Sequence, residues 1–404
     1  MTQTPQTFAM GRAEFVALVA TMLATVAFSI DAMLPALPQI GAELSPQRIE
    51  NAPLILTLFL LGMGLGTFIT GPLSDAYGRK PVILTFSALY ILGAALAWAS
   101  QSLEMLLAAR LLQGFGAAGP RVVALAVVRD RFSGRQMAQV VSVVMMIFTL
   151  VPAFAPLLGD FIVAWTGWRG IFAAFIVFSM FYCAWVLLRL PETLPPAARR
   201  PLQLPLIRAA IAEILRHPVV RISVLTQMLV SAMLFVTLML VQQIYDLVYD
   251  RGAAFAVWFF GVAIVGGLAS LLNAVLVVRI GMQRLIVAAL GIQVALSGAF
   301  ILFDLGGGAL GFYWFVLWQT MIFCQAALTI GNLNALAMEP MGHIAGTAAS
   351  VMSALATVGA VVVAGPIGAM FNGSERVLIG AVLVMAVVAL IAMLTLKRTP
   401  RVTL

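Results

Sequence analysis

Long uninterrupted stretches of apolar residues recur along almost the whole chain, with short polar segments between them. Twelve of them are close to the length that a membrane-spanning helix needs, at residues 15–37, 52–73, 82–100, 103–128, 137–166, 168–190, 219–245, 253–278, 285–303, 310–338, 344–371 and 377–396. A bilayer core requires about 20 apolar residues per helix. Because the stretches are continuously apolar, they differ from the short alternating strands of a membrane β-barrel. The pattern predicts an all-α membrane protein with twelve transmembrane helices.

Composition supports this class. Hydrophobic residues make up 63% of the chain and charged residues only 9%. Soluble domains carry about 25% charged residues, so a chain this poor in charge cannot cover a water-facing surface. Most of its surface must therefore face lipid.

The basic residues predict the orientation of the chain. The net charge is +8, but the Lys and Arg residues lie in short segments between the apolar stretches, without the interleaved aromatic residues of a nucleic-acid groove. Seventeen fall on the side of the N-terminus and four on the other side. By the positive-inside rule both termini are cytoplasmic. The first stretch lacks a small-residue cleavage site and is interpreted as a permanent helix that also acts as a signal anchor.

The longest inner segment divides the chain into two halves. We expect an N-terminal six-helix bundle at residues 1–190, a cytoplasmic linker at 191–217 and a C-terminal six-helix bundle at 218–404. Within the linker, residues 205–216 are expected to form a helix on the membrane surface. Weak echoes relate the halves, among them Gly78 with Arg79 and, six stretches later, Arg279 with Gly281. Repeated halves are typical of secondary transporters.

The segment GPLSDAYGRKPVIL (residues 71–84) resembles the cytoplasmic signature of the major facilitator superfamily. The resemblance implies a major facilitator fold of two six-helix bundles and a role for Gly71, Asp75, Gly78, Arg79 and Lys80 in closing the cytoplasmic gate. Gly71 permits close helix approach and Gly78 a tight turn. Asp75 can accept hydrogen bonds from Arg79 and from a nearby helix N-terminus. The alternative is an ordinary charged loop.

Asp31 is the one carboxylate deep inside an apolar stretch. A charge at the bilayer centre costs about 2.5–3.5 kcal/mol, so such a residue usually serves a function. The segment IDAMLPALPQI (residues 30–40) resembles the start of the Bcr/CflA branch of drug:H⁺ antiporters, which implies that Asp31 is a proton or cation site. The alternative is a carboxylate that caps the loop ahead of Pro35 and Pro38.

Arg110 begins RLLQGFGAAG (residues 110–119), which resembles the family's Arg-x-x-Gln-Gly motif, in which the arginine is linked to proton coupling. Gln113 is the motif glutamine and a candidate substrate ligand. Counting about 1.5 Å per residue places Asp31 roughly 25 Å and Arg110 roughly 20 Å above the inner membrane face. We therefore expect the two to pair. A purely structural buried pair is the alternative.

Arg121 lies eleven residues after Arg110, on nearly the same helical face and roughly 16 Å deeper. A second arginine facing the central cavity would favour anionic or zwitterionic substrates. The alternative is that Arg121 extends to the inner membrane interface.

The fifth stretch contains VPAFAPLLGD (residues 151–160), which resembles the antiporter motif Gly-x-x-x-Gly-Pro-x-x-Gly-Gly. Pro156 and Gly159 match, whereas Ala155 and Asp160 replace two of the glycines. Together with Pro152, the motif predicts a kinked, closely packed helix. Such a helix would also suit a symporter.

No cofactor or metal is expected. Residues 114–119 match a dinucleotide-binding fingerprint, but inside an apolar helix they indicate close packing. Lys80 is followed by a proline rather than by the Ser or Thr of an ATP-binding loop, so an ion gradient is the expected energy source. The histidines and cysteines are too isolated to bind a metal. In the second half, Gln227, Ser231 and Asn332 are candidate substrate ligands, although some such polar residues will be hydrogen-bonded between helices.

The sequence thus predicts a proton-coupled secondary transporter of the bacterial inner membrane rather than an enzyme. Multidrug efflux by drug/H⁺ antiport is the primary hypothesis. Its alternative is proton-coupled transport of one metabolite, such as a sugar, amino acid or organic anion. The expected partners are drug-like small molecules, protons and the lipid bilayer. We expect a monomer that binds no nucleic acid.

Overall fold

The structure is a computed structural model that describes residues 10–48, 51–199, 204–307 and 310–396. Within these ranges every regular element is helical. Twelve helices are long and apolar enough to cross a membrane. The predicted class, an all-α membrane protein with twelve spans, is confirmed.

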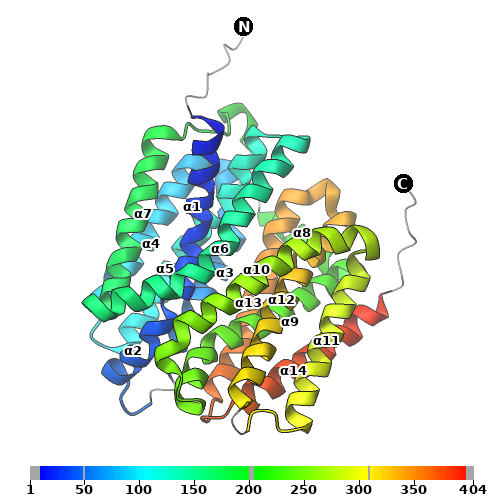
Figure 1. Ribbon diagram of the computed structural model, residues 1–404. Coiled ribbons are helices and arrows are strands. Elements are labelled where there is room, and N and C mark those ends of the chain that lie inside the picture. Colours follow the sequence, from blue (N-terminus) through cyan, green and yellow to red (C-terminus); the bar gives the residue numbers. More distant parts are fainter. Residues whose placement is uncertain (1–9, 49–50, 200–203, 308–309, 397–404) are drawn as a thin grey trace.

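The helices form two halves that lie side by side, blue to blue-green and green to red in Figure 1. The first half comprises α1 (Arg12–Asp31), α2 (Leu37–Leu44), α3 (Leu54–Tyr77), α4 (Arg79–Trp98), α5 (Leu103–Arg131), α6 (Gly134–Thr166) and α7 (Arg169–Arg189). The second half comprises α9 (Pro218–Gln243), α10 (Phe255–Ile280), α11 (Met282–Leu302), α12 (Gly311–Met338), α13 (Ala345–Ala369) and α14 (Glu375–Thr395). Between them lies α8 (Leu204–Arg216).

Successive spanning helices alternate in direction, which defines two sides of the molecule. We call the side on which α1 begins the terminal side; the α3–α4 turn and the end of α14 also belong to it. The opposite side, where α1 ends and α3 begins, is the distal side.

The first apolar stretch does not form one straight helix. The sequence predicts a helix over residues 15–37, whereas α1 ends at Asp31 and continues as a short 3-10 turn (Leu34–Ala36) followed by α2. Pro35 and Pro38 lack the N–H group that a continuous helix needs. The break makes Asp31 the last residue of α1.

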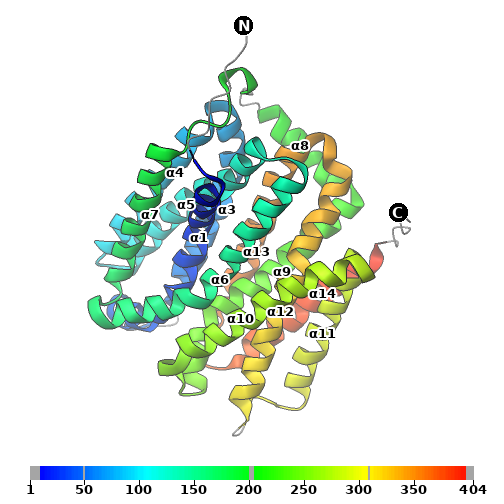
Figure 2. The same cartoon turned by 45° about the horizontal axis from the view of Figure 1, so that its top comes forward.

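Glycines bring α5 into direct contact with α3 and α4. The space for a side chain at Gly114 is filled by the backbone carbonyl of Phe59, and that at Gly116 by the backbone of Tyr90. Residues 114–119 are therefore a helix-packing surface, as expected, and not a dinucleotide site. Figure 2 shows α1 lying among the helices of the same half.

We expect Gly114→Ala to destabilise the protein strongly, because the added methyl group would collide with the Phe59 carbonyl. Overpacking of this kind costs about 1–3 kcal/mol or more. Gly291 of α11 is the control, because no atom lies within 4 Å of its side-chain position. Gly291→Ala should be neutral or slightly stabilising. Thermal unfolding of both variants in detergent tests this, and an equal effect at the two positions would contradict it.

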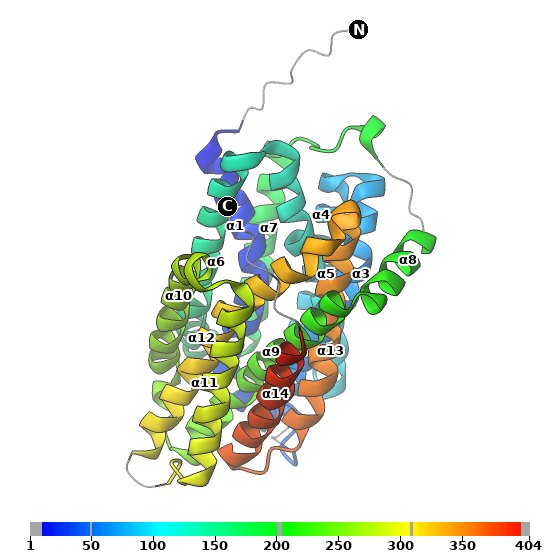
Figure 3. The ribbon, with the colours of Figure 1, turned by 90° about the vertical axis from the view of Figure 1, so that its right-hand side faces the viewer.

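The linker contains the helix predicted over residues 205–216, observed as α8. Its Ile214 is 1% exposed and packs in a cluster with Val220 of α9 and Val351 and Met352 of α13. Figure 3 shows α8 beside α13. One face of α8 thus rests on the second half, and its contact with a membrane surface stays a prediction.

Among the described residues, the most extensive contacts between the halves are made by α3 with α13 and by α6 with α10. Along α3 and α13, a methyl group on Gly64 would lie 2.7 Å from Val358, and one on Gly71 would lie 3.3 Å from Ser350. Between α6 and α10, the rings of Phe154 and Phe260 have centroids 5.3 Å apart. Gly71 therefore permits the close helix approach predicted from the sequence.

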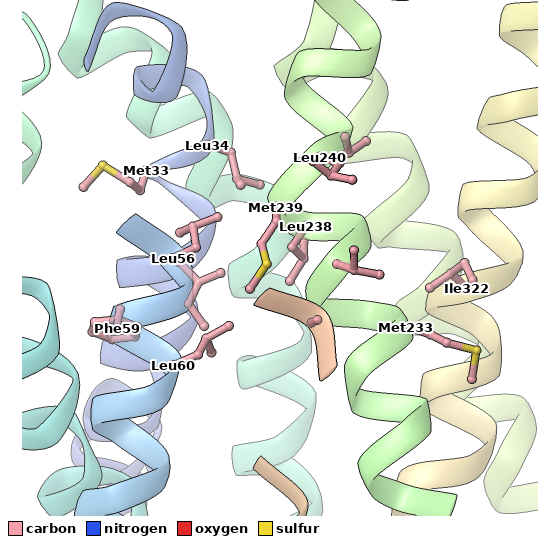
Figure 4. Packing of buried hydrophobic residues seen from close by; sticks show 14 of the residues in the cluster. Met33, Leu34, Leu56, Phe59, Leu60, Met233, Leu238, Met239, Leu240 and Ile322 are labelled. Atoms are coloured by element: carbon pink, nitrogen blue, oxygen red, sulfur yellow. The ribbon is translucent and has the colours of Figure 1, made fainter. Parts of the chain in front are cut away.

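Apolar side chains seal the distal side between the halves. Figure 4 shows Leu56 and Leu60 of α3 facing Leu238 and Met239 of α9. All four are at most 6% exposed, and the Thr57 hydroxyl lies 3.5 Å from the Met239 sulfur. The two halves therefore meet here through buried apolar side chains.

Candidate functional site

Asp31 is buried at the end of α1, with 5% of its surface exposed. Within the described ranges its carboxylate accepts no hydrogen bond and forms no ion pair. The main effect of its surroundings is therefore to shield it from water. It does not cap the turn ahead of Pro35 and Pro38, because the N–H of Ala32 bonds to Phe28 and that of Ala36 to Met33. A carboxyl group isolated in this way is stable only when it is protonated or when a partner approaches.

Helix α6 packs directly on the residue that follows Asp31. The side-chain space of Gly159 is occupied by the backbone carbonyl of Ala32. Pro156 and Pro152 lie about one and two turns earlier, within a helix that runs unbroken from Gly134 to Thr166. The close packing predicted for this motif is therefore observed, and it ties α6 to the Asp31 segment. The kink stays a prediction.

Arg110 is completely buried, and its guanidinium donates hydrogen bonds to acceptors within the protein. Its Nη1 donates to Oε1 of Gln113 at 2.7 Å, its Nη2 to the backbone carbonyl of Ser29 at 3.0 Å and its Nε to that of Ile55 at 3.4 Å. The guanidinium also lies 4.3 Å from the ring centroid of Phe59. Arg110 thus joins α5 to α1 and α3.

The predicted pairing of Asp31 with Arg110 is not formed in this conformation. The depth estimate was sound, because Arg110 bonds to Ser29, two residues before Asp31. Its side chain, however, binds backbone carbonyls and Gln113 rather than the carboxylate. Depth along a helix says nothing about the direction in which a side chain points.

A hydroxyl pair lies next to Arg110. The hydroxyl of Ser29 is 2.6 Å from that of Tyr90, and the Ser29 hydroxyl also donates to the carbonyl of Thr25 at 2.6 Å. Both side chains are fully buried. Gln113 keeps one amide nitrogen without a partner. Arg110 therefore belongs to a polar cluster in the middle of the first half.

Arg121 is partly exposed, and its Nη1 atom is shielded from solvent without a hydrogen-bond partner. No ion pair involves Arg121 among the described residues. On the next turn of the same face, Leu125 is 37% exposed. At least one N–H group of this guanidinium therefore lacks an acceptor among the described residues.

The second-half candidates differ from one another. Asn332 donates to Asn273 of α10 at 2.8 Å and to the carbonyl of Leu328 at 2.7 Å, so its amide N–H groups are used between and within helices. Gln227 is 6% exposed and has an amide oxygen without a partner. Ser231 lies one turn further along α9 and is partly exposed. Gln227 and Ser231 remain candidates, whereas Asn332 is better explained as an interhelical contact.

Arg79 organises the predicted gate on the terminal side. It donates to Asp75 at 2.6 Å, as the sequence predicts, to Ser74 at 2.7 Å and to Asp130 of α5 at 2.9 Å. Asp75 accepts no bond from a helix N-terminus among the described contacts, because Arg79 is its partner. Lys80 instead donates to the carbonyl of Leu187 at 2.8 Å. The gate residues therefore tie α3, α4, α5 and α7 together.

Glu192, after the end of α7, caps the start of α4. Its two carboxylate oxygens accept the backbone N–H groups of Arg79 at 2.9 Å and Lys80 at 3.1 Å. The adjacent Thr193 donates to Asp130 at 2.9 Å. A carboxylate at a helix N-terminus is favourable because it faces unpaired N–H groups and the positive end of the helix dipole.

Sequence reasoning missed Asp130, Glu192 and Thr193. A signal was present, because Asp130 and Glu192 are carboxylates in segments dominated by basic residues. Local motifs cannot show that segments more than 50 positions apart meet at one arginine.

Gly78 makes the tight turn predicted from the sequence, with φ +105°. Its counterpart Gly281, between α10 and α11, has φ +84°. These angles are uncommon for residues with a side chain. The repeated turn supports the internal echo between the halves. Only Gly78 is also crowded, because a methyl group there would lie 2.6 Å from Glu192.

We expect Gly78→Ala to lower stability more than Gly281→Ala. Both substitutions bear the cost of a backbone region that is essentially restricted to glycine, about 1–3 kcal/mol, but only the first displaces Glu192 from the start of α4. Gly281 has no atom within 4 Å of its side-chain position. Melting temperatures of the purified variants measure the difference. Equal losses would show that Glu192 does not stabilise this turn.

Twelve spanning helices in two halves, with a buried acid in the first and an arginine-centred network at one face, describe a membrane carrier. Residues 17–364 match the model of the Major Facilitator Superfamily. The chain belongs to this family and is a multi-pass membrane protein.

Similar proteins indicate the branch of the family to which the chain belongs. The chain is 30% identical to the bicyclomycin resistance protein homolog of Haemophilus influenzae over 81% of its own length and 82% of that protein. It is 28% identical to the multidrug resistance protein MdtL of Shewanella oneidensis, with 80% of each chain covered. These similarities confirm the Bcr/CflA-type branch. A solved D-xylose–proton symporter shares the fold with TM-score 0.74 and 16% identity, covering 94% of this chain and 97% of that one.

Proposed function

We propose that this protein exports drug-like small molecules across the bacterial inner membrane in exchange for protons. The observation that carries the proposal is Asp31, a buried and unpaired carboxyl group at the break between α1 and α2. Relatives of similar length bear the names of drug-resistance proteins. The protein acts as a transporter and not as an enzyme, with both termini in the cytoplasm.

The mechanism follows from the cost of burying charge. With the distal side sealed, Asp31 holds a proton, because an unpaired carboxylate is costly in an apolar setting. When α1 moves relative to α3 and α5, the guanidinium of Arg110 comes closer to Asp31 and favours proton release. Release on the cytoplasmic side and uptake on the other couple the proton gradient to substrate movement. Each charge that crosses 100 mV supplies about 2.3 kcal/mol.

The gate acts on the terminal side in this scheme. Asp75, Arg79, Asp130 and Glu192 hold α3, α4 and α5 as one unit. The first half can then tilt against the second along the α3–α13 and α6–α10 contacts. Rigid-body rocking of two halves is the usual form of alternating access.

The direction of transport tests the proposal. Purified protein is reconstituted in vesicles that contain a pH dye and a fluorescent neutral amphiphile, and a pH gradient is imposed in either direction. An antiporter moves the amphiphile against the proton flux, and the flux stops with a protonophore. Movement of substrate along the proton flux would instead show the alternative, a proton symporter for a metabolite. Substrate movement that is indifferent to the gradient would refute both.

A further inference from the structure

Arg121 differs from the other described membrane-embedded cation, Arg110, because no hydrogen-bond acceptor or carboxylate among the described residues contacts it. Arg110 donates to three acceptors within its own half. Arg121 has a shielded Nη1 atom with no partner and no ion pair in the described part of the chain. A guanidinium offers five N–H donors, and burying it without an acceptor is costly. An external acceptor would remove that cost.

The direction in which the Arg121 side chain leans argues against a contact with lipid headgroups. Its depth alone does not, because Arg121 lies roughly 16 Å below Arg110 and so only about 4 Å inside the inner membrane face. Side chains lean toward the start of their helix. Because α5 begins on the distal side, Arg121 leans into the membrane and away from the nearer surface.

Part of this face of α5 is not covered by the described residues of the protein. Eleven residues separate Arg121 from Arg110, so the two lie on nearly the same face of α5, the face from which Arg110 reaches α1 and α3. Arg121 itself is partly exposed, and Leu125 on the next turn is 37% exposed. An exposed apolar side chain and a cation without a partner in the described residues thus lie one turn apart on this face.

We propose that Arg121 binds the anionic group of amphiphilic substrates, such as a carboxylate, and so gives the transporter a preference for anionic over neutral molecules of the same shape. This inference rests on the proposed transport function and names its substrate class. A bidentate contact between a guanidinium and a carboxylate supplies the missing acceptor.

The test uses three ring-matched probes, phenylbutyrate, phenylbutyramide and phenylbutylamine, with wild type, Arg121→Gln, Arg121→Lys and the control Arg129→Gln. Arg129 is an exposed arginine near the terminal end of the same helix. Affinities are measured in detergent, and exchange is measured in phosphatidylcholine vesicles. We expect wild type and Arg129→Gln to bind the acid about tenfold tighter than the amide or more. Arg121→Gln should lose this ratio, and Arg121→Lys should keep part of it.

Several results would overturn the inference. These are an equal affinity of wild type for acid and amide, a ratio unchanged in Arg121→Gln, or equal losses for all three probes in a variant that melts like wild type. If Arg121→Gln does not fold, the wild-type ratio and Arg121→Lys still decide. A loss of preference seen only in vesicles with anionic lipid would assign Arg121 to lipid headgroups. Proton exchange with the neutral amide in wild type tests the proposed function separately, so the two can fail independently.

Discussion

Asp31→Asn should reduce proton-coupled efflux to the level of vesicles without protein, while the variant folds as well as wild type. Asparagine has nearly the shape of aspartic acid but cannot carry an exchangeable acidic proton. Asp31 has no hydrogen-bond or ion-pair partner among the described residues, so the substitution breaks no such bond there. It also removes a group whose charged form costs about 2.5–3.5 kcal/mol in a membrane helix. Its melting temperature should therefore equal or exceed that of wild type.

The matched control is Asp160→Asn. Asp160 lies on α6, one residue after Gly159, and is exposed. Efflux driven by an imposed pH gradient, with a pH dye inside the vesicles, compares the two variants. Only Asp31→Asn should uncouple transport. If it retains full gradient-driven efflux, Asp31 is not the proton site and another group must carry the proton.

Arg110→Lys should weaken both the fold and coupled transport, although it keeps the positive charge. A lysine ammonium cannot reproduce the planar contacts of a guanidinium to Ser29, Ile55 and Gln113. Losing one or two of these hydrogen bonds costs about 1–3 kcal/mol of folding free energy. The three acceptors come from α1, α3 and α5, so their loss loosens the segment that leads to Asp31.

Arg12→Lys is the control for this substitution. Arg12 is exposed and makes one side-chain bond, to Gln139 at 2.9 Å, so a lysine there should be neutral. Melting temperature and the number of protons exchanged per substrate are the measurements. An Arg110→Lys protein with wild-type stability and stoichiometry would show that charge alone matters at this position.

The sequence alone determined the features that depend on residues close together in the chain. The length and continuity of the apolar stretches predicted twelve spans because hydrocarbon admits only segments that satisfy their own backbone groups. Asp31 could be identified as a functional candidate because placing a carboxylate inside an apolar stretch costs free energy, and such residues usually serve a function. The turn at Gly78 and the bond from Arg79 to Asp75 also depend on neighbouring residues, and both were predicted correctly.

Only the tertiary structure decided how distant segments meet. The sequence placed Arg110 near the depth of Asp31 but could not show that its side chain turns to the carbonyls of Ser29 and Ile55. It likewise gave no reason to bring Asp130 and Glu192 to Arg79, because they lie 51 and 113 positions away. The periodicity of a helix and the free-energy cost of burying a charge in it can be estimated from consecutive residues. The direction of a side chain and the identity of its partner depend on how the helices pack.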